Sequence, residues 1–215
     1  NMAYVIGGFA DRGLRRIVVA DNGSTDRTAH FAQMAGAEVV SAPKRGYGSA
    51  CLAGLRYLAE EPPDVVVFVD GDGADDPENL EALLAPIRSG DADFVVGSRI
   101  RGHVDPGALT PVQHFGNVLS CVLVKILFGV EFTDLGPFRA IRWQALERLE
   151  MADQDFGWTV EMQAKAAKRG IRSVEVPVDC RRRYAGKSKV SGTLSGSVKA
   201  GIKILYTIGR EALRR

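Results

Sequence analysis

The feature that most constrains the fold is the run Val65-Val-Val-Phe-Val69, in which five consecutive apolar residues are followed at once by Asp70-Gly-Asp72. A short run that is apolar on both faces is typical of a strand in the middle of a parallel sheet. In open α/β sheets, ligands bind at the carboxyl ends of such strands. The sequence therefore predicts a buried strand that brings two carboxylates to a ligand-binding edge.

Strand-like and helical segments alternate along the first part of the chain, with short loops between them. After a helix within residues 3–10, we expect strands at 17–20, 38–41, 65–69 and 94–96, and helices at about 27–36, 49–60 and 77–88. This alternation predicts an α/β fold with a doubly wound, mostly parallel, Rossmann-like sheet that carries helices on both faces. Such a sheet normally opens with a strand, and none precedes the first helix, so we expect the first strand to be missing from these residues.

The pattern changes after Arg99. Helices are expected at about 112–128, 142–149 and 158–169, followed by a strand at 174–178, a basic Gly/Ser-rich loop and a closing helix at about 194–215. Residues 1–185 are therefore expected to form one α/β domain. Residues 186–215 are expected to add the basic loop and an amphipathic helix that packs on the domain, on a membrane or on a partner subunit.

Composition alone excludes few partners. A hydrophobic content of 46%, a charged content of 25% and a net charge of +2 are ordinary for a folded protein. No run of about 20 apolar residues is present, so no membrane-spanning helix is predicted. Cys51, Cys121 and Cys180 are widely spaced and odd in number, which favours reduced buried thiols and a cytoplasmic protein.

The acidic cluster after the buried strand has the composition of a metal site. Asp70 and Asp72 are separated by one glycine, and Gly73 allows a tight turn that brings Asp75 or Asp76 to the same place. Hard oxygen ligands suit Mg²⁺ or Mn²⁺, which complete their coordination with water and substrate phosphates. The alternative is an acidic turn at a helix start, which accounts for Asp76 but poorly for Asp70 and Asp72, because two carboxylates repel each other beside a buried strand.

Four short motifs follow one another along the chain: Asp21-Asn-Gly-Ser-Thr-Asp26, Asp70-Gly-Asp72, Gly97-Ser-Arg99 and Gly186-Lys-Ser-Lys189. Together they resemble the family 2 glycosyltransferases of the GT-A fold, and among these the bacterial relatives of dolichyl- and polyprenyl-phosphate mannose and glucose synthases. The resemblance implies that Asp70, Asp72 and Asp75 hold a metal ion. It also implies that Asp70, Gly71 and Asp72 lie against the diphosphate of a nucleotide sugar. The opening Pro-x-x-Asn-Glu strand of the family is not seen.

The resemblance implies further donor contacts. Asp21 would bind the base or ribose of the nucleotide, although a carboxylate there can also be a helix cap, as is expected of Asp26. Ser24 or Thr25 can also cap the helix that follows. Gly46 and Gly48, in Arg45-Gly-Tyr-Gly-Ser49, would lie near the nucleotide, because glycine permits the close approach of a ligand. A tight connection explains these glycines almost as well.

Arg99, Asp134 and Arg139 are the candidate catalytic residues. Arg99 follows the strand at 94–96 and would bind a phosphate, unless it pairs with an aspartate of the acidic cluster. The segment Thr133-Asp134-Leu-Gly-Pro-Phe-Arg139 resembles the Asp-x-x-Ser-Gly-Phe-Arg segment of the family. This implies that Asp134 holds the sugar or orients the acceptor, with Arg139 nearby. A buried pair of Asp134 and Arg139 that only fixes the loop is an equal alternative.

Two further groups complete the predicted site. Glu161, near a helix start, faces the sugar hydroxyls in one interpretation and only the helix dipole in the other. Arg183, Lys187, Ser188 and Lys189 lie where glycine and serine interrupt a basic run, and a loop of this kind suits phosphate binding. Nucleic acid is not expected as a partner, because the basic run carries no stacking aromatic residue besides Tyr184.

These expectations describe an inverting transfer of a hexose from a UDP- or GDP-sugar to an acceptor such as a polyprenyl phosphate, assisted by Mg²⁺ or Mn²⁺. A phosphate acceptor needs no strong base, whereas a hydroxyl acceptor would need one, for which Asp134 is the first choice. We expect a cytoplasmic protein, peripheral on the cytoplasmic face of a membrane, and leave a homo-oligomer open. The alternatives are a sugar nucleotidyltransferase and an inactive nucleotide-sugar-binding protein of the same fold.

Overall fold

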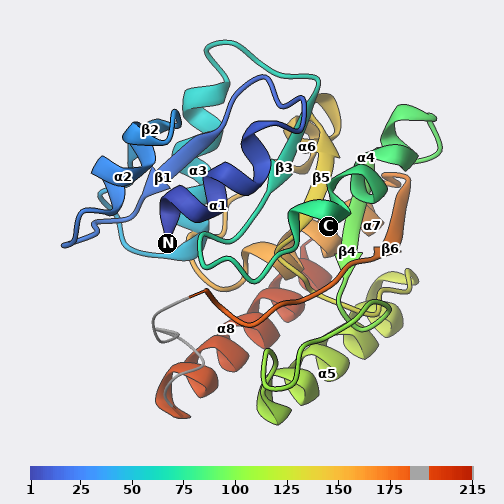
Figure 1. Cartoon of the computed structure of the whole chain (residues 1–215). Coiled ribbons are helices and arrows are strands. Elements are labelled where there is room, and N and C mark those ends of the chain that lie inside the picture. The colour runs from blue at the N-terminus through green and yellow to red at the C-terminus, as the bar shows by residue number, and fades with distance from the viewer. Residues whose placement is uncertain (185–193, 215) are drawn as a thin grey trace.

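The computed structural model describes residues 1–184 and 194–214, and the strands in these residues form two sheets (Figure 1). One sheet pairs β1 (Val18–Asp21) in parallel with β2 (Glu38–Ser41). The other has the order β3-β5-β4-β6 and contains β3 (Val65–Phe68), β5 (Arg139–Arg142), β4 (Phe94–Ser98) and β6 (Ser173–Pro177). β4 and β6 are parallel, whereas β5 runs antiparallel to both of its neighbours. The predicted α/β fold is confirmed, but β3 lies at an edge of its sheet and not in the middle of a parallel one.

The helices occur where the sequence places them, to within a few residues. They are α1 (Met2–Ala10), α2 (Thr28–Met34), α3 (Tyr47–Leu58), the 3-10 turn η1 (Pro77–Asn79), α4 (Leu80–Arg88), α5 (Pro111–Phe128), α6 (Trp143–Leu149), α7 (Trp158–Lys168) and α8 (Leu194–Leu213). Of the expected caps of α2, neither Ser24 nor Thr25 caps the helix, whereas the Asp26 carboxylate accepts from the backbone N–H of Thr28, the first residue of the helix.

The larger sheet is covered on both faces. Phe94 and Val96 of β4 point into a core shared with α5, α6 and α7, which contains Trp158. Val95, between them, points to the opposite face and packs with Leu83 of α4 and its neighbours. This alternation follows from the two-residue period of a strand. Burial of both faces fixes the register of β4 and so fixes the place of the residues that follow it at Gly97-Ser-Arg99.

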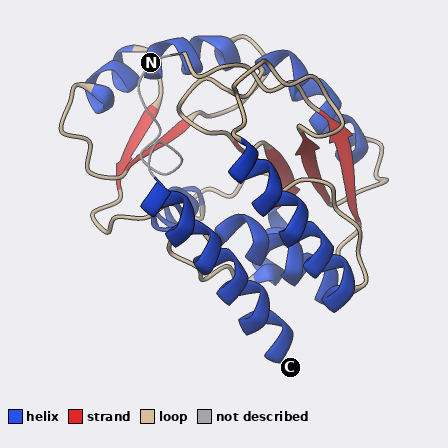
Figure 2. Ribbon diagram, turned by 90° about the horizontal axis from the view of Figure 1, so that it is seen from below, coloured by secondary structure: helices blue, strands red, loops and turns tan. Residues whose placement is uncertain are grey.

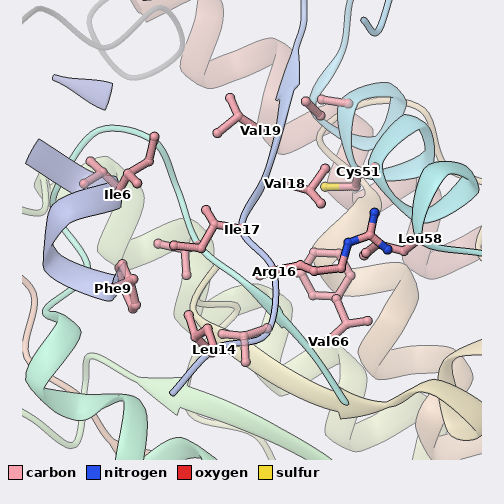
Figure 3. Close-up of a pocket in the computed structure, with 18 of the residues that line it drawn as sticks. Ile6, Phe9, Leu14, Arg16, Ile17, Val18, Val19, Cys51, Leu58 and Val66 are labelled. Atoms are coloured by element: carbon pink, nitrogen blue, oxygen red, sulfur yellow. The ribbon is translucent and has the colours of Figure 1, made fainter. Parts of the chain in front are cut away.

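An apolar slot of about 580 Å³ separates the two sheets. Among the described residues, no strand pairs with the edge of β1 or of β3 that faces this slot. Figure 3 shows its lining, to which α1 contributes Ile6 and Phe9, β1 and the residues before it contribute Ile17 and Val18, and β3 contributes Val66. The sheet is thus interrupted in the region where an opening strand is expected.

The helices α5 and α8 lie side by side below the sheets (Figure 2). Both carry exposed apolar side chains: Val112, Phe115, Val118, Val122, Ile126 and Leu127 on α5, and Val198, Ile202, Leu205 and Tyr206 on α8. By length and composition α5 also qualifies as a membrane span, although no such helix is expected from the sequence. One face of α5, with Cys121 and Val124, is buried in the domain, so the helix belongs to the fold.

Candidate active site

The acidic turn, residues 70–76, is folded by its own carboxylates. Asp75 accepts from the backbone N–H of Asp70 over 3.0 Å, and Asp72 accepts from that of Ala74 over 2.9 Å. The Asp76 carboxylate accepts from Glu78 N over 3.0 Å and caps η1, as expected of a helix-start residue. Gly73 has a φ of +78°, a conformation that glycine adopts without strain. The turn therefore holds Asp70 and Asp72 at the end of β3 in one fixed arrangement.

Negative charge in this turn is only partly balanced. Burial and then the repulsion of Asp72 raise the pKa of Asp70, and burial and then the repulsion of Asp70 raise the pKa of Asp75. The Tyr47 side chain acts in the opposite direction and lowers the pKa of Asp70, which favours the ionised carboxylate. Tyr47 lies within the Gly-rich segment, and no role for it was predicted from the sequence. A positive group placed here would relieve the repulsion.

The donor set fits a divalent cation in part. Within the part of the chain that the structure describes, no three Asp, Glu, His or Cys side chains are arranged to hold one metal ion together. Asp75 turns its carboxylate to the backbone of Asp70, which argues against its predicted role as a third ligand. Asp70 and Asp72 remain, and Mg²⁺ or Mn²⁺ is commonly held by one or two carboxylates together with substrate phosphates.

The segment 180–184, which we call the basic arm, lies antiparallel to the acidic turn. Cys180 forms a β-bridge with Asp75, and Arg181 N donates to the carbonyl of Ala74 over 2.8 Å. Arg183 Nη2 lies 2.9 Å from Asp72 Oδ2. The structure therefore brings predicted donor-binding residues from two distant segments together. The other members of the predicted basic group, Lys187, Ser188 and Lys189, lie outside the described residues.

Arg99 reaches the same place from the end of β4. Its Nε and Nη2 donate to the two oxygens of Asp134 over 2.8 and 2.7 Å, and its backbone N–H donates to Asp134 as well. Although burial opposes the charge of the guanidinium, this contact raises the pKa of Arg99 above its ordinary value. Arg99 also lowers the pKa values of Asp70 and Asp75 through its charge. It is thus a fixed positive group beside the acidic turn.

Asp134 itself is completely buried, and Arg99 occupies both of its oxygens. This arrangement argues against Asp134 as a group that holds sugar or takes a proton. Arg139 is also completely buried and donates to the carbonyls of Leu135, Gly136 and Thr159. Burial lowers its pKa to about 10. The expected loop-fixing pair exists, but its arginine is Arg99 and not Arg139.

A cleft of about 340 Å³ runs from the acidic turn to the pair of long helices. At one end it is lined by Asp70, Asp72, Asp75, Arg99 and Arg183, and at the other by Val112 and Gly116 of α5 and Ala200, Gly201 and Ile204 of α8. The site therefore combines a charged end, suited to phosphates and a cation, with an apolar end between two helices.

Comparison with known proteins decides the family. A family model described as glycosyl transferase family 2 matches residues 10–150. An uncharacterised glycosyltransferase of Mycobacterium tuberculosis is 39% identical over 187 residues, which cover 86% of this chain and 82% of that protein. The chain belongs to glycosyltransferase family 2.

Two further relatives are named for their substrates. The undecaprenyl-phosphate mannosyltransferase of Micrococcus luteus is 32% identical over 199 residues, covering 86% of this glycosyltransferase and 80% of the relative. The polyprenol monophosphomannose synthase of Mycolicibacterium smegmatis is 31% identical over 191 residues, covering 82% and 71%. The predicted resemblance to this branch of the family is confirmed.

Solved structures establish the fold. Glucosyl-3-phosphoglycerate synthase from Mycobacterium tuberculosis, in complex with UDP, matches with a TM-score of 0.78 at 22% identity, over 98% of this chain and 75% of that one. The same synthase in complex with Mn²⁺, UDP-glucose and phosphoglyceric acid matches with a TM-score of 0.73. The predicted GT-A architecture of this glycosyltransferase is thereby confirmed.

The remaining predicted donor residues have partners within the protein. Asp21, at the end of β1, accepts from Ser24 N over 3.1 Å. A Cβ atom at Gly46 or Gly48 would overlap the carbonyls of the segment 153–154, so close packing against that segment explains both glycines. Gly71 lies against the flexible end of the Met2 side chain, which could shift, so packing constrains this glycine less. A ligand contact at these positions stays a prediction.

Glu161 is completely buried in the glycosyltransferase and does not line the cleft. Its Oε2 accepts from Ala152 N and Asp153 N, over 3.1 and 2.8 Å. Its Oε1 lies 2.9 Å from Lys165 Nζ and 3.0 Å from Arg210 Nη2. These contacts tie α7 to α8 and argue against a role in binding the sugar.

Two residues that fix the Asp134 loop were not predicted from the sequence. Asn117 of α5 donates to Thr133 O and accepts from Leu135 N, over 2.9 and 2.8 Å. Glu175 of β6 accepts from the backbone N–H groups of Thr133 and Asp134. Asn117 lies in an apolar helix and Glu175 lies between two valines of a strand. A polar residue in an apolar element usually has a buried hydrogen-bond partner, so these two positions could have been identified from the sequence.

Proposed function

We propose that this glycosyltransferase moves a hexose from a nucleotide sugar to a polyprenyl phosphate at a membrane surface, with inversion at the anomeric carbon. The observation that carries the proposal is the shape of the cleft, which joins a charged end at Asp70, Asp72 and Arg99 to an apolar end between α5 and α8. A polyprenyl phosphate has the same two parts, a phosphate and an apolar chain. The names of two relatives support this acceptor class.

The donor is assigned to the charged end. Asp70 and Asp72 would hold a divalent cation, which would supply positive charge to neutralise the departing diphosphate. Arg99 and Arg183 offer guanidinium groups to the phosphate oxygens, and Arg99 is already oriented by Asp134 before any ligand binds. Orientation in advance lowers the cost of organising the site around the charge that develops during transfer.

The acceptor is assigned to the apolar end. A phosphate oxygen is already an anion and attacks the anomeric carbon on the face opposite the diphosphate, so a single displacement inverts the configuration. This chemistry matches a site in which both oxygens of Asp134 are bound by Arg99, so that Asp134 is not available to accept a proton. A hydroxyl acceptor would need a base, and the cleft presents His114 at the exposed start of α5 for that purpose. The exposed apolar side chains of α5 and α8 continue the cleft outward as a surface for lipid.

The test is a transfer assay with the purified chain, Mn²⁺ and radiolabelled UDP-glucose or GDP-mannose, with undecaprenyl phosphate in detergent as acceptor. We expect labelled lipid to form only when both Mn²⁺ and the lipid phosphate are present, and anomeric NMR of the product to report inversion. His114→Ala should leave kcat within about two-fold. Transfer to soluble sugar alcohols in preference to the lipid, abolished by His114→Ala, would overturn the acceptor assignment. If neither nucleotide sugar binds in the presence of Mn²⁺, the donor assignment is overturned.

A further inference from the structure

Arg183 occupies the oxygen of Asp72 that the protein backbone leaves available. Asp72 Oδ1 accepts from Ala74 N over 2.9 Å and is thereby committed to the turn. Asp72 Oδ2 has the guanidinium of Arg183 at 2.9 Å. The charge of Arg183 also acts on Asp70, whose pKa it lowers. Arg183 therefore supplies positive charge at the very carboxylates that the proposed function assigns to a divalent cation.

The backbone on both sides of Arg183 is held by contacts that do not involve its guanidinium. Arg181 N donates to Ala74 O over 2.8 Å, and Tyr184 N donates to Asp72 O over 3.1 Å. The ring of Tyr184 stacks on that of Tyr4 with a centroid distance of 4.1 Å. The side chain of Arg183 can consequently change partner by rotation alone, while the basic arm stays in place.

The exchange is also energetically accessible. The side chain of Arg183 is 41% exposed, and ion pairs that retain this much solvent contribute little to stability. The same side chain lines both the slot between the sheets and the cleft, so it has open space on either side of Asp72. Because the ion pair of Asp72 with Arg183 is weak, a divalent cation can replace Arg183 at the Asp72 carboxylate at little cost in free energy.

We propose, on the basis of the proposed function, that Arg183 is an exchangeable counter-ion: it neutralises Asp72 in the protein without metal and moves to the donor diphosphate when a divalent cation binds Asp72. Arg183 thus competes with the cation for one carboxylate oxygen and assists the diphosphate. Removal of its charge should have opposite effects on the two ligands, whereas a purely structural or purely phosphate-binding arginine would not produce that pair of effects.

The experiment compares Arg183→Gln with Arg181→Gln, because Arg181 lies in the same arm and pairs with Asp76, which caps η1. Both variants lose one positive charge close to the acidic turn. Free Mn²⁺ is followed by electron paramagnetic resonance in titrations of each protein, and binding of UDP, with GDP in parallel, is measured by calorimetry at saturating Mn²⁺. Thermal melts of both variants verify that they are folded.

For Arg183→Gln we expect Mn²⁺ to bind about three- to five-fold more tightly and the nucleoside diphosphate on the order of ten-fold more weakly. For Arg181→Gln we expect Mn²⁺ affinity within about two-fold of the original chain. If both variants gain Mn²⁺ affinity equally, the gain results from the change in net charge, and the proposed exchange of Arg183 is overturned. Unchanged or weaker Mn²⁺ binding in Arg183→Gln, with the original chain binding both ligands, would overturn the exchange alone. An original chain that binds neither Mn²⁺ nor either diphosphate would overturn the proposed function with it.

Discussion

Arg99 and Asp134 form a two-pronged ion pair across 35 residues of sequence, with N–O distances of 2.8 and 2.7 Å. The Asp134 side chain is completely buried, whereas the Arg99 side chain is 19% exposed and lines the cleft. The sequence predicts a catalytic role for Asp134, whereas its contacts in the structure orient Arg99. We therefore propose that Asp134 acts on a ligand through Arg99.

The first prediction concerns this pair. Asp134→Asn leaves a largely buried arginine without its counter-charge, so the free energy of unfolding should fall by about 3 kcal/mol. Donor affinity should fall with it, because Arg99 loses its orientation. Glu131→Gln removes one partner of the exposed pair with Lys125 and should change stability by no more than about 0.5 kcal/mol. Urea titrations of the two variants measure the difference, and equal losses would show that the Asp134 contact carries no special weight.

The second prediction separates the two kinds of aspartate in the acidic turn. Asp72→Asn should lower Mn²⁺-dependent donor binding by at least ten-fold while the protein stays folded, because the amide is a poor ligand for a hard cation. Asp76→Asn keeps an oxygen that can still cap η1 and should leave donor binding within about three-fold. Calorimetry with UDP-glucose at fixed Mn²⁺ gives both numbers. Comparable losses in the two variants would make the whole turn, and not Asp72, the determinant.

The third prediction concerns pH. The pKa values of Asp70 and Asp75 are raised, chiefly by burial, so the folded protein without metal retains protons that the unfolded chain releases. This shift stabilises the metal-free protein below the ordinary aspartate pKa, near 4, and the contribution is lost as pH rises through the folded values. A cation requires the ionised carboxylates, so Mn²⁺ binding should release protons and weaken as pH falls from 8 to 6.

Calorimetry of Mn²⁺ binding in two buffers with different ionisation enthalpies checks that proton release. Titrations at pH 8, 7 and 6 check the direction of the affinity change. Affinity that does not vary over this range, with no proton released, would contradict the assignment of Asp70 to the cation.

Features of the fold and of the site that depend on residues close together in the sequence could be predicted from it. The apolar run Val65–Val69 predicts both a strand and the place where it ends, because a fully apolar segment stops where the first charges appear. Asp76 and Pro77 mark a helix start through their own backbone chemistry. Each of these inferences depends on neighbours a few residues away, and each is confirmed.

The parts that sequence reasoning missed depend on distant partners. β5 has the sequence Arg139-Ala-Ile-Arg142, which contains no apolar run, and its strand state comes from insertion between β3 and β4. Asp134 has Arg139 five residues away but pairs with Arg99, because the loop held by Asn117 and Glu175 aims its carboxylate toward the end of β4. Spacing along the chain identifies the charged groups but not which of them meet.

The fourth prediction concerns the apolar surface of α5 and α8. Ile126 is 71% exposed on α5, so Ile126→Glu should leave the fold intact while it places a charge in the proposed lipid surface. Sedimentation with vesicles of phosphatidylglycerol and phosphatidylcholine should show binding weakened on the order of ten-fold, since a fully buried isoleucine contributes roughly 1.5–3 kcal/mol.

Met34→Glu is the matched control, because Met34 is 75% exposed on α2, away from this surface. If the two substitutions weaken vesicle binding equally, the loss results from the change in net charge and not from the apolar surface of α5 and α8. If Ile126→Glu instead converts a dimer to a monomer in analytical ultracentrifugation and leaves vesicle binding unchanged, the surface joins two subunits and the lipid assignment fails.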